Sequence, residues 1–168
     1  ERVASLAPRH GGVRYLAGTA ALPMGQVDAG ISHLQAAAQA EPARGEYRAQ
    51  LARAWAMGNR IPRALAEADA ALALPGLDPV SLDTLGAVFT RANAHRRAAE
   101  VYRRASELDP GHAGHHFNLA VSHMYLGDMD AAEREYEAAI AADPRCWRAY
   151  LGLAQLRQQT HEHNHLPL

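Results

Sequence analysis

Residues 81–110 read SLDTLGAVFTRANAHRRAAEVYRRASELDP, and residues 115–144 read HHFNLAVSHMYLGDMDAAEREYEAAIAADP. The two stretches carry small and apolar residues at matching offsets, and each ends in Asp-Pro. In the first stretch, Leu82, Leu85 and Phe89 recur every three or four positions, which places them on one face of a helix. The two stretches therefore predict a repeated unit of two helices.

A series of helix breakers with a period of 34 residues runs through the chain. Its positions are Pro8, Pro42, Gly76, Pro110 and Pro144. A period of this length is typical of helical repeat arrays, in which each helix pair buries its apolar face only against its neighbours. The sequence therefore predicts an all-α solenoid of antiparallel helix pairs.

Counting from the breakers gives the predicted boundaries. Four repeats span 11–44, 45–78, 79–112 and 113–146, residues 1–10 end a preceding repeat, residues 147–160 form a capping helix, and residues 161–168 are a linker or tail. The predicted helices are 11–23, 27–40, 45–57, 61–73, 79–92, 95–108, 113–126, 129–142 and 147–159. Pro23 is expected to end the first of these early. Close helix approach is predicted at Gly86, Ala98, Ala105, Ala120, Ala132 and Ala139.

The third repeat carries a known spacing pattern. Its elements are Leu82, Leu85, Gly86, Phe89, Ala98, Tyr102, Ala105 and Pro110. This spacing resembles the tetratricopeptide repeat (TPR), and the resemblance covers nearly the whole chain. It is looser in the first repeat, where Arg14 and Ala21 replace large apolar residues. The resemblance implies a right-handed α-solenoid that binds proteins or peptides.

A narrower resemblance concerns the C-terminal half. The stretches DTLG (83–86), FNLA (117–120), GD with AAE (127–133) and AQLRQQTHEHNH (154–165) occur in this order. Together they resemble the repeat region that precedes the catalytic domain in bacterial TPR-containing sulfotransferases. This implies a substrate-recognition or scaffolding arm, with the catalytic domain beyond residue 168. The alternative is a stand-alone TPR adaptor or a self-associating structural protein, which leaves homo-oligomerisation open.

The resemblance also implies a peptide-binding groove, because the first helix of each repeat lines the concave side of such arrays. The groove-facing positions are Tyr15, Thr19, Gln50, Arg53, Asp83, Thr84, Phe117, Asn118, Tyr125, Arg148, Gln155 and Gln159. Amide and guanidinium groups bind a peptide backbone or a carboxylate, and tyrosine adds contact area. We expect Asn118 and Arg148, on consecutive first helices, to act as a pair. The alternative is that any one of these residues is merely a solvated helix residue.

Histidines of the fourth repeat form a cluster with two interpretations. His116 and His123 occupy positions where large side chains pack between the two helices, so we predict hydrogen-bonded core histidines there. His115 is expected to face elsewhere. A metal ion at this cluster would instead use His115, His116 and Cys146.

Residues His161, Glu162 and His165 match the pattern of zinc proteases. That chemistry needs a formed helix, a third ligand and an enclosing cleft. The motif lies just before Pro167, near the end of the chain, so we predict no catalytic zinc site there. The alternative is adventitious metal binding by His161, His163 and His165.

Composition narrows the classes of function. Seventeen basic residues, all arginine, face eighteen acidic ones for a net charge of −1, which argues against nucleic acid as the main partner. Cys146 is the only cysteine, so no intrachain disulfide can form. The sequence has no apolar run of about 20 residues, no Gly-rich loop between a strand and a helix, and no nucleophile motif. We therefore expect a cytoplasmic protein without membrane segments, and a chain without catalytic residues, metal or cofactor.

Overall fold

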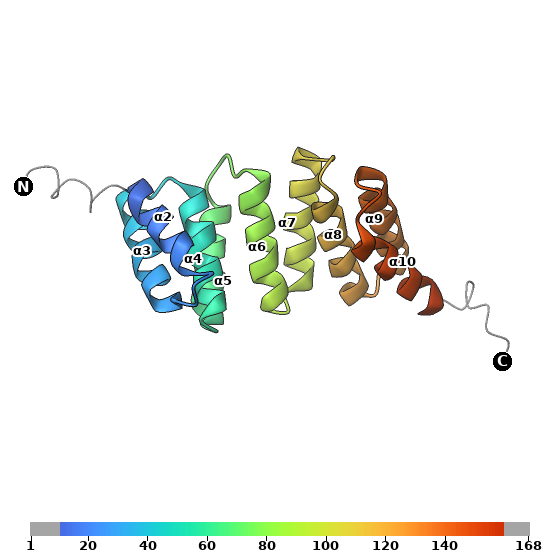
Figure 1. Cartoon of the computed structure of the whole chain (residues 1–168), viewed down its shortest axis with the longest axis horizontal. Helices are drawn as coiled ribbons and strands as arrows, with labels where there is room; N and C mark the ends of the chain where they lie inside the picture. The colour runs from blue at the N-terminus through green and yellow to red at the C-terminus, as the bar shows by residue number, and fades with distance from the viewer. Residues whose placement is uncertain (1–10, 160–168) are drawn as a thin grey trace, which may run out of the picture. The chain divides into compact units, whose positions relative to one another are not determined.

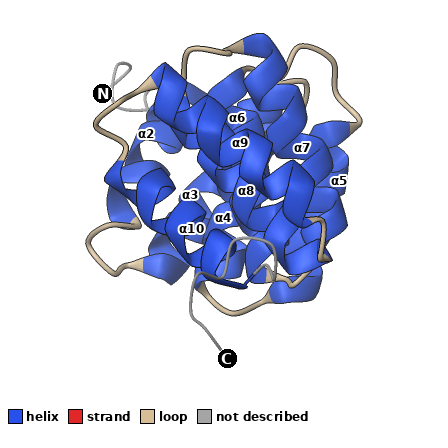
Figure 2. Cartoon of the chain, turned by 90° about the vertical axis from the view of Figure 1, so that its right-hand side faces the viewer, coloured by secondary structure: helices blue, strands red, loops and turns tan. Residues whose placement is uncertain are grey.

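The computed structural model of the chain describes residues 11–159, and every regular element in that range is an α-helix (Figure 1). The helices are α2 (Gly11–Ala21), α3 (Val27–Ala40), α4 (Gly45–Met57), α5 (Ile61–Leu72), α6 (Pro79–Arg91), α7 (His95–Leu108), α8 (Ala113–Leu126), α9 (Met129–Ala142) and α10 (Trp147–Gln159). Figure 2 shows only helices and the loops that join them in this range. The helix ends lie within two residues of the predicted ones. The largest difference is at α2, which ends early because Pro23 disfavours a helical residue before it.

The turn inside each helix pair contains one residue in the left-handed region of the backbone. These residues are Gly25, Asn59, Asn93 and Gly127, with φ of 75°, 56°, 55° and 79°. They are 34 residues apart, so they form a second periodic series beside the breakers. Glycine and asparagine adopt this conformation at the lowest cost.

Backbone hydrogen bonds close these turns in a common way. The N–H after the left-handed residue donates to the carbonyl five residues earlier, at 2.9–3.0 Å, in the pairs Gln26–Ala21, Arg60–Trp55 and Asp128–His123. This bond satisfies a carbonyl group that the end of the helix would otherwise leave free.

The turns between helix pairs depend on the breaker series. The residue before proline has an extended φ of −134° at Glu41, −138° at Asp109 and −141° at Asp143. Proline causes this, because its ring disfavours the helical region for the preceding residue. At the position without proline, Gly76 instead takes a φ of 73°. The 34-residue period is therefore maintained in two ways, by a proline that restricts the preceding residue and, at residue 76, by a glycine in the left-handed region.

The helices form two compact units, divided between Asn93 and Ala94: α2–α6 in unit 1 and α7–α10 in unit 2. Within unit 1, α3 packs against α2 and α4, and α4 also packs against α5 and α6. Glycine permits the close contact of α2 with α3, because a Cβ on Gly18 would lie 2.6 Å from Cγ of Leu34.

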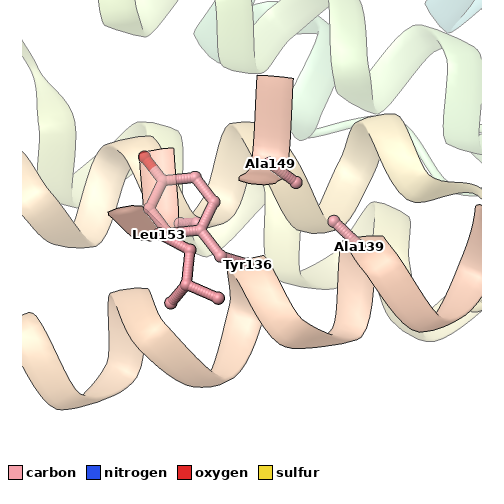
Figure 3. Close-up of a cluster of buried hydrophobic side chains, with 5 residues drawn as sticks. Tyr136, Ala139, Ala149 and Leu153 are labelled. Carbon is pink, nitrogen blue, oxygen red and sulfur yellow. The ribbon is translucent and has the colours of Figure 1, made fainter. Parts of the chain in front are cut away.

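Within unit 2, α8 packs against α7 and α9, and α10 packs against α9. One cluster of its core consists of the buried residues Ala120, Tyr136, Ala139, Ala149 and Leu153 (Figure 3). The cluster joins three helices, and Tyr136 supplies its one aromatic ring. The small residues predicted at close contacts are all buried: Gly86, Ala98, Ala105, Ala120, Ala132 and Ala139.

An ion-pair cluster also holds α10 to α9. Nε of Arg157 donates to Oε1 of Glu133 at 2.7 Å, and its Nη2 donates to Oε1 of Glu137 at 2.9 Å. The two glutamates lie four residues apart, so they face the same side of α9. One guanidinium therefore bridges two residues about one turn apart on the neighbouring helix.

Candidate functional site

An open cleft of about 480 Å³ lies among α8, α9 and α10 of unit 2. We call it the unit-2 cleft, and its lining residues are Phe117, Val121, Met124, Tyr125, Tyr136, Trp147, Arg148, Leu151, Gly152 and Gln155. All but Arg148 and Gln155 are apolar or aromatic side chains or glycine. A concave apolar surface with a few polar groups is the usual form of a ligand site.

The floor of the cleft depends on a close contact between α10 and α9. A Cβ on Gly152 would lie 2.5 Å from Cζ of Tyr136, so only glycine lets the ring lie under the helix. The Tyr136 ring is 2% exposed and tilted against Phe117, with 5.9 Å between the ring centroids. Its hydroxyl donates to the sulfur of Met124 at 2.9 Å. Burial, with a smaller contribution from Tyr125, raises the pKa of Tyr136 above its ordinary value of 10.0.

The rim of the cleft exposes large apolar side chains. Trp147 is 69% exposed, Tyr125 68% and Leu151 52%. Trp147 and Leu151 are four residues apart on α10 and therefore share one face of that helix. Large apolar residues gathered around a hollow indicate an interaction site, whereas single exposed ones do not.

Arg148 supplies the positive charge of the cleft. Its Cζ lies 4.3 Å from the centroid of the Phe117 ring, which is a cation–π contact. The ring holds the flat guanidinium in place and leaves the donors at its edge free to bind a carbonyl or a carboxylate. Gln155, on the same helix, adds an exposed amide.

Four of the groove residues predicted from the sequence lie together in this cleft: Phe117, Tyr125, Arg148 and Gln155. Asn118 does not line it, and Arg148 contacts the Phe117 ring. The carbonyl of Asn118 accepts a hydrogen bond from the Ser122 hydroxyl at 3.0 Å.

Most of the other predicted groove residues belong to unit 1. Tyr15 stacks on Tyr47 with 4.7 Å between ring centroids, and the Thr19 hydroxyl donates to the Tyr15 carbonyl at 3.0 Å. Burial, followed by the nearby Glu46, raises the pKa of Tyr15. Gln50 accepts a hydrogen bond from Arg53 at 3.4 Å.

The two predicted residues on α6 differ in exposure. Asp83 is half-buried. Thr84 is only 9% exposed, and its hydroxyl donates to the Val80 carbonyl at 2.9 Å. The donor hydrogen of Thr84 is therefore used within its own helix. The side chain of Gln159, the last groove residue, lies outside the described residues.

Sequence reasoning missed several residues of the unit-2 cleft, chiefly Trp147 and Leu151. It took Trp147 only as the start of a capping helix. The sequence did contain a signal for these residues. Trp147 and Leu151 are four residues apart, on either side of Arg148, so they add apolar surface to the helix face of the predicted groove.

The histidines of α8 differ in part from the prediction. His116 is a half-buried, hydrogen-bonded residue, with Nδ1 2.8 Å from Oε2 of Glu135 and Nε2 3.2 Å from the Pro110 carbonyl. His115 is 3% exposed and its ring lies against the His112 ring, so it is buried as well. Helix α8 packs against both α7 and α9, so a face away from its own repeat partner is also covered.

His123 departs from the prediction in its hydrogen bonding. It is half-buried, and its buried Nδ1 has no hydrogen-bond partner among the described residues. Oδ2 of Asp128 is the acidic atom paired with it, at 3.7 Å, which is beyond hydrogen-bond distance.

Two absences hold for residues 11–159. No three His, Cys, Asp or Glu side chains in this range are grouped so as to hold a metal ion. None of the helices in it is both long enough and apolar enough to cross a membrane. The motif at His161, Glu162 and His165 lies outside the described residues.

Comparison with known proteins identifies the repeat. The family model "Tetratricopeptide repeat" matches residues 15–79 and 117–159, together more than half of the chain. Among the curated proteins, no sequence matches significantly.

Solved structures are similar to this chain at low sequence identity. MamA from Desulfovibrio magneticus RS-1 has a TM-score of 0.78 and 18% identity over 92% of this chain and 87% of its own. Pseudomonas aeruginosa PilF has a TM-score of 0.79 and 19% identity, over 90% and 69%. YrrB, described as a TPR protein with an unusual peptide-binding site, has a TM-score of 0.74 and 14% identity, over 91% and 78%. These likenesses confirm the all-α, TPR-like fold class.

Proposed function

Because the chain belongs to the tetratricopeptide repeat family, whose repeats bind proteins or peptides, we propose that it binds an extended segment of a partner protein in the unit-2 cleft. The observation that carries the proposal is the exposure of Trp147, Tyr125 and Leu151 around one apolar hollow. Tryptophan and tyrosine are among the side chains that most often dominate binding energy when a partner covers them. In the proposed complex, an apolar side chain of the partner segment enters the hollow.

Polar groups of the cleft would fix the orientation of the segment. Arg148, held against Phe117, and the exposed amide of Gln155 lie on the same helix as Trp147. They can bind backbone carbonyls of a peptide on either side of its apolar side chain. The peptide-binding site described for YrrB belongs to that protein, and it supports the proposal only by showing what this fold can do.

The two tryptophans of the chain provide the test, because Trp55 is 5% exposed and Trp147 is 69% exposed. The probe is a neutral peptide of Leu, Phe, Asn and Gln. We expect it to shift the tryptophan emission to shorter wavelength and to protect Trp147 from acrylamide. Leu151→Ala should weaken binding about fivefold or more.

A matched control separates binding from general loss of apolar surface. Leu108 on α7 is also exposed, at 60%, and does not line the cleft. Leu108→Ala should leave the affinity unchanged. Equal effects of the two substitutions, or an unchanged Trp147 signal at saturating peptide, would rule out the unit-2 cleft as the site.

The narrower hypothesis, that the module is the recognition or scaffolding arm of a sulfotransferase, rests on the order of the sequence stretches from residue 83 to residue 165. Membership of the tetratricopeptide repeat family supports the repeat array, but it gives no support for a neighbouring sulfotransferase domain. The test is the gene sequence after Leu168. A strand followed by a loop rich in Gly, Ser and Thr would support the hypothesis, and a stop codon would refute it.

A further inference from the structure

We propose that unit 1 carries a second peptide site, between α4 and α6, which takes an acidic segment with an aliphatic side chain. The site is separate from the unit-2 cleft, and the inference rests on the proposed function only for the peptide nature of the occupant. We call it the unit-1 cleft. It measures about 440 Å³ and is lined by Arg53, Ala56, Met57, Ala87, Val88, Thr90 and Arg91.

The unit-1 cleft has an apolar floor without aromatic rings. Ala56 and Val88 are 3% and 2% exposed, and Met57, at 37%, lies partly open to the solvent. Methionine is flexible and fills irregular space, so it can adapt to an entering side chain. The Thr90 hydroxyl donates to the Gly86 carbonyl at 3.0 Å and is thus satisfied within its own helix. Such a floor suits an aliphatic side chain.

The walls of the cleft carry one arginine each. Arg53 on α4 and Arg91 on α6 are both exposed. Nη1 of Arg53 donates to the neutral Gln50 amide, and no carboxylate is among the described residues that line the cleft. Arg91 is in the last turn of α6, where the helix dipole favours a cation. Two positive charges therefore flank an apolar hollow without a negative charge between them.

Charge complementarity selects the occupant. A guanidinium binds a carboxylate through two parallel hydrogen bonds, so Asp or Glu on either side of an aliphatic residue would match the two walls. Nucleic acid fits poorly, because it needs a surplus of basic charge and the net charge of the chain is −1. The floor also offers no ring on which a base could stack.

The test compares two fluorescein-labelled peptides by anisotropy. In the acidic probe Asp and Glu alternate with Leu and Val, and in the neutral probe Asn and Gln replace the acids. At about 50 mM NaCl the chain should bind the acidic probe about fivefold more tightly, and this preference should shrink at about 500 mM NaCl because salt screens exposed charges.

Three double variants decide whether the arginines of the unit-1 cleft cause the preference. R53Q/R91Q should abolish the preference for the acidic probe. R53K/R91K keeps both positive charges, so it should keep a preference that shrinks at high salt. The matched control is R96Q/R104Q, which removes two exposed charges from α7, outside the cleft. A preference that survives in R53Q/R91Q, or that falls equally in R96Q/R104Q, would overturn the inference.

Failure of the proposed function at the unit-2 cleft can be distinguished from failure of the unit-1 site. Leu151→Ala acts on the unit-2 cleft, so it should weaken the neutral probe and leave binding of the acidic probe at the unit-1 cleft unchanged. If it has no effect while R53Q/R91Q removes the acidic preference, the unit-2 proposal fails and the unit-1 site stands.

Discussion

At the scale of single residues, glycine determines whether the unit-2 cleft can exist. The absence of a side chain at Gly152 lets α10 lie directly over the buried ring of Tyr136, so that Trp147 and Leu151 on the same helix form a rim above it. A methyl group there would have to displace a ring that is only 2% exposed. One missing side chain therefore sets both the packing of the last helix and the depth of the hollow.

Gly152→Ala should destabilise the protein by about 1–3 kcal/mol, because the added methyl overpacks a site that cannot relax. The measurement is the free energy of unfolding in urea, followed by circular dichroism. Gly12→Ala is the control, since its Cβ would meet only the Tyr47 hydroxyl at 3.7 Å. The control should be neutral or slightly stabilising, because alanine favours a helix. Similar losses in both variants would contradict the packing argument.

Tyr136 should make the protein sensitive to alkali. Its pKa is raised by burial, so the fold stabilises the neutral phenol. The contribution of the neutral phenol to the free energy of unfolding is complete below the unfolded pKa of about 10. It is lost as the pH rises through the pKa of the folded state. The melting temperature should thus fall above about pH 10, and less steeply in Tyr136→Phe. Tyr15, whose pKa is also raised, contributes to the remaining slope. Identical slopes would exclude Tyr136 as a cause.

At the scale of elements, α10 is attached to α9 by two kinds of contact. Ala149 and Leu153 pack into the core cluster, and Arg157 reaches two glutamates of α9 at 2.7 and 2.9 Å. Nearby carboxylates raise the pKa of Arg157, Glu133 being the main one, so the guanidinium keeps its charge. The charged contact positions a helix that carries most of the rim of the unit-2 cleft.

Arg157→Gln should lower the melting temperature at low salt, because Glu133 and Glu137 lose their shared partner. The difference from the wild type should shrink at about 500 mM NaCl, where exposed charges are screened. Arg134→Gln provides the control, since Arg134 is an exposed arginine of α9 outside this cluster. A loss that does not depend on salt would mean that Arg157 acts through packing of its stem.

At the scale of the whole molecule, the sequence predicts helix ends far better than it predicts sites. Pro42, Pro110 and Pro144 impose a backbone conformation on the residue before them, so their effect is local and can be read from the sequence. The environment of His115 and the contact of Arg148 with Phe117 depend on neighbouring helices and on rotamers. Helical register gives only the direction in which a side chain leaves its helix, so it does not reveal the contact of Arg148 with the Phe117 ring.

The left-handed residues Gly25, Asn59, Asn93 and Gly127 have a consequence for changing the length of the chain. They keep the same 34-residue period as the breakers, so any 34 consecutive residues contain one turn of each kind. Duplicating or deleting a segment of that length leaves every remaining turn with its own closing residue, whatever the starting point. A segment of 30 or 38 residues would instead leave one helix roughly one turn longer or shorter than its neighbours. We therefore expect the fold to tolerate the duplication or deletion of whole 34-residue periods.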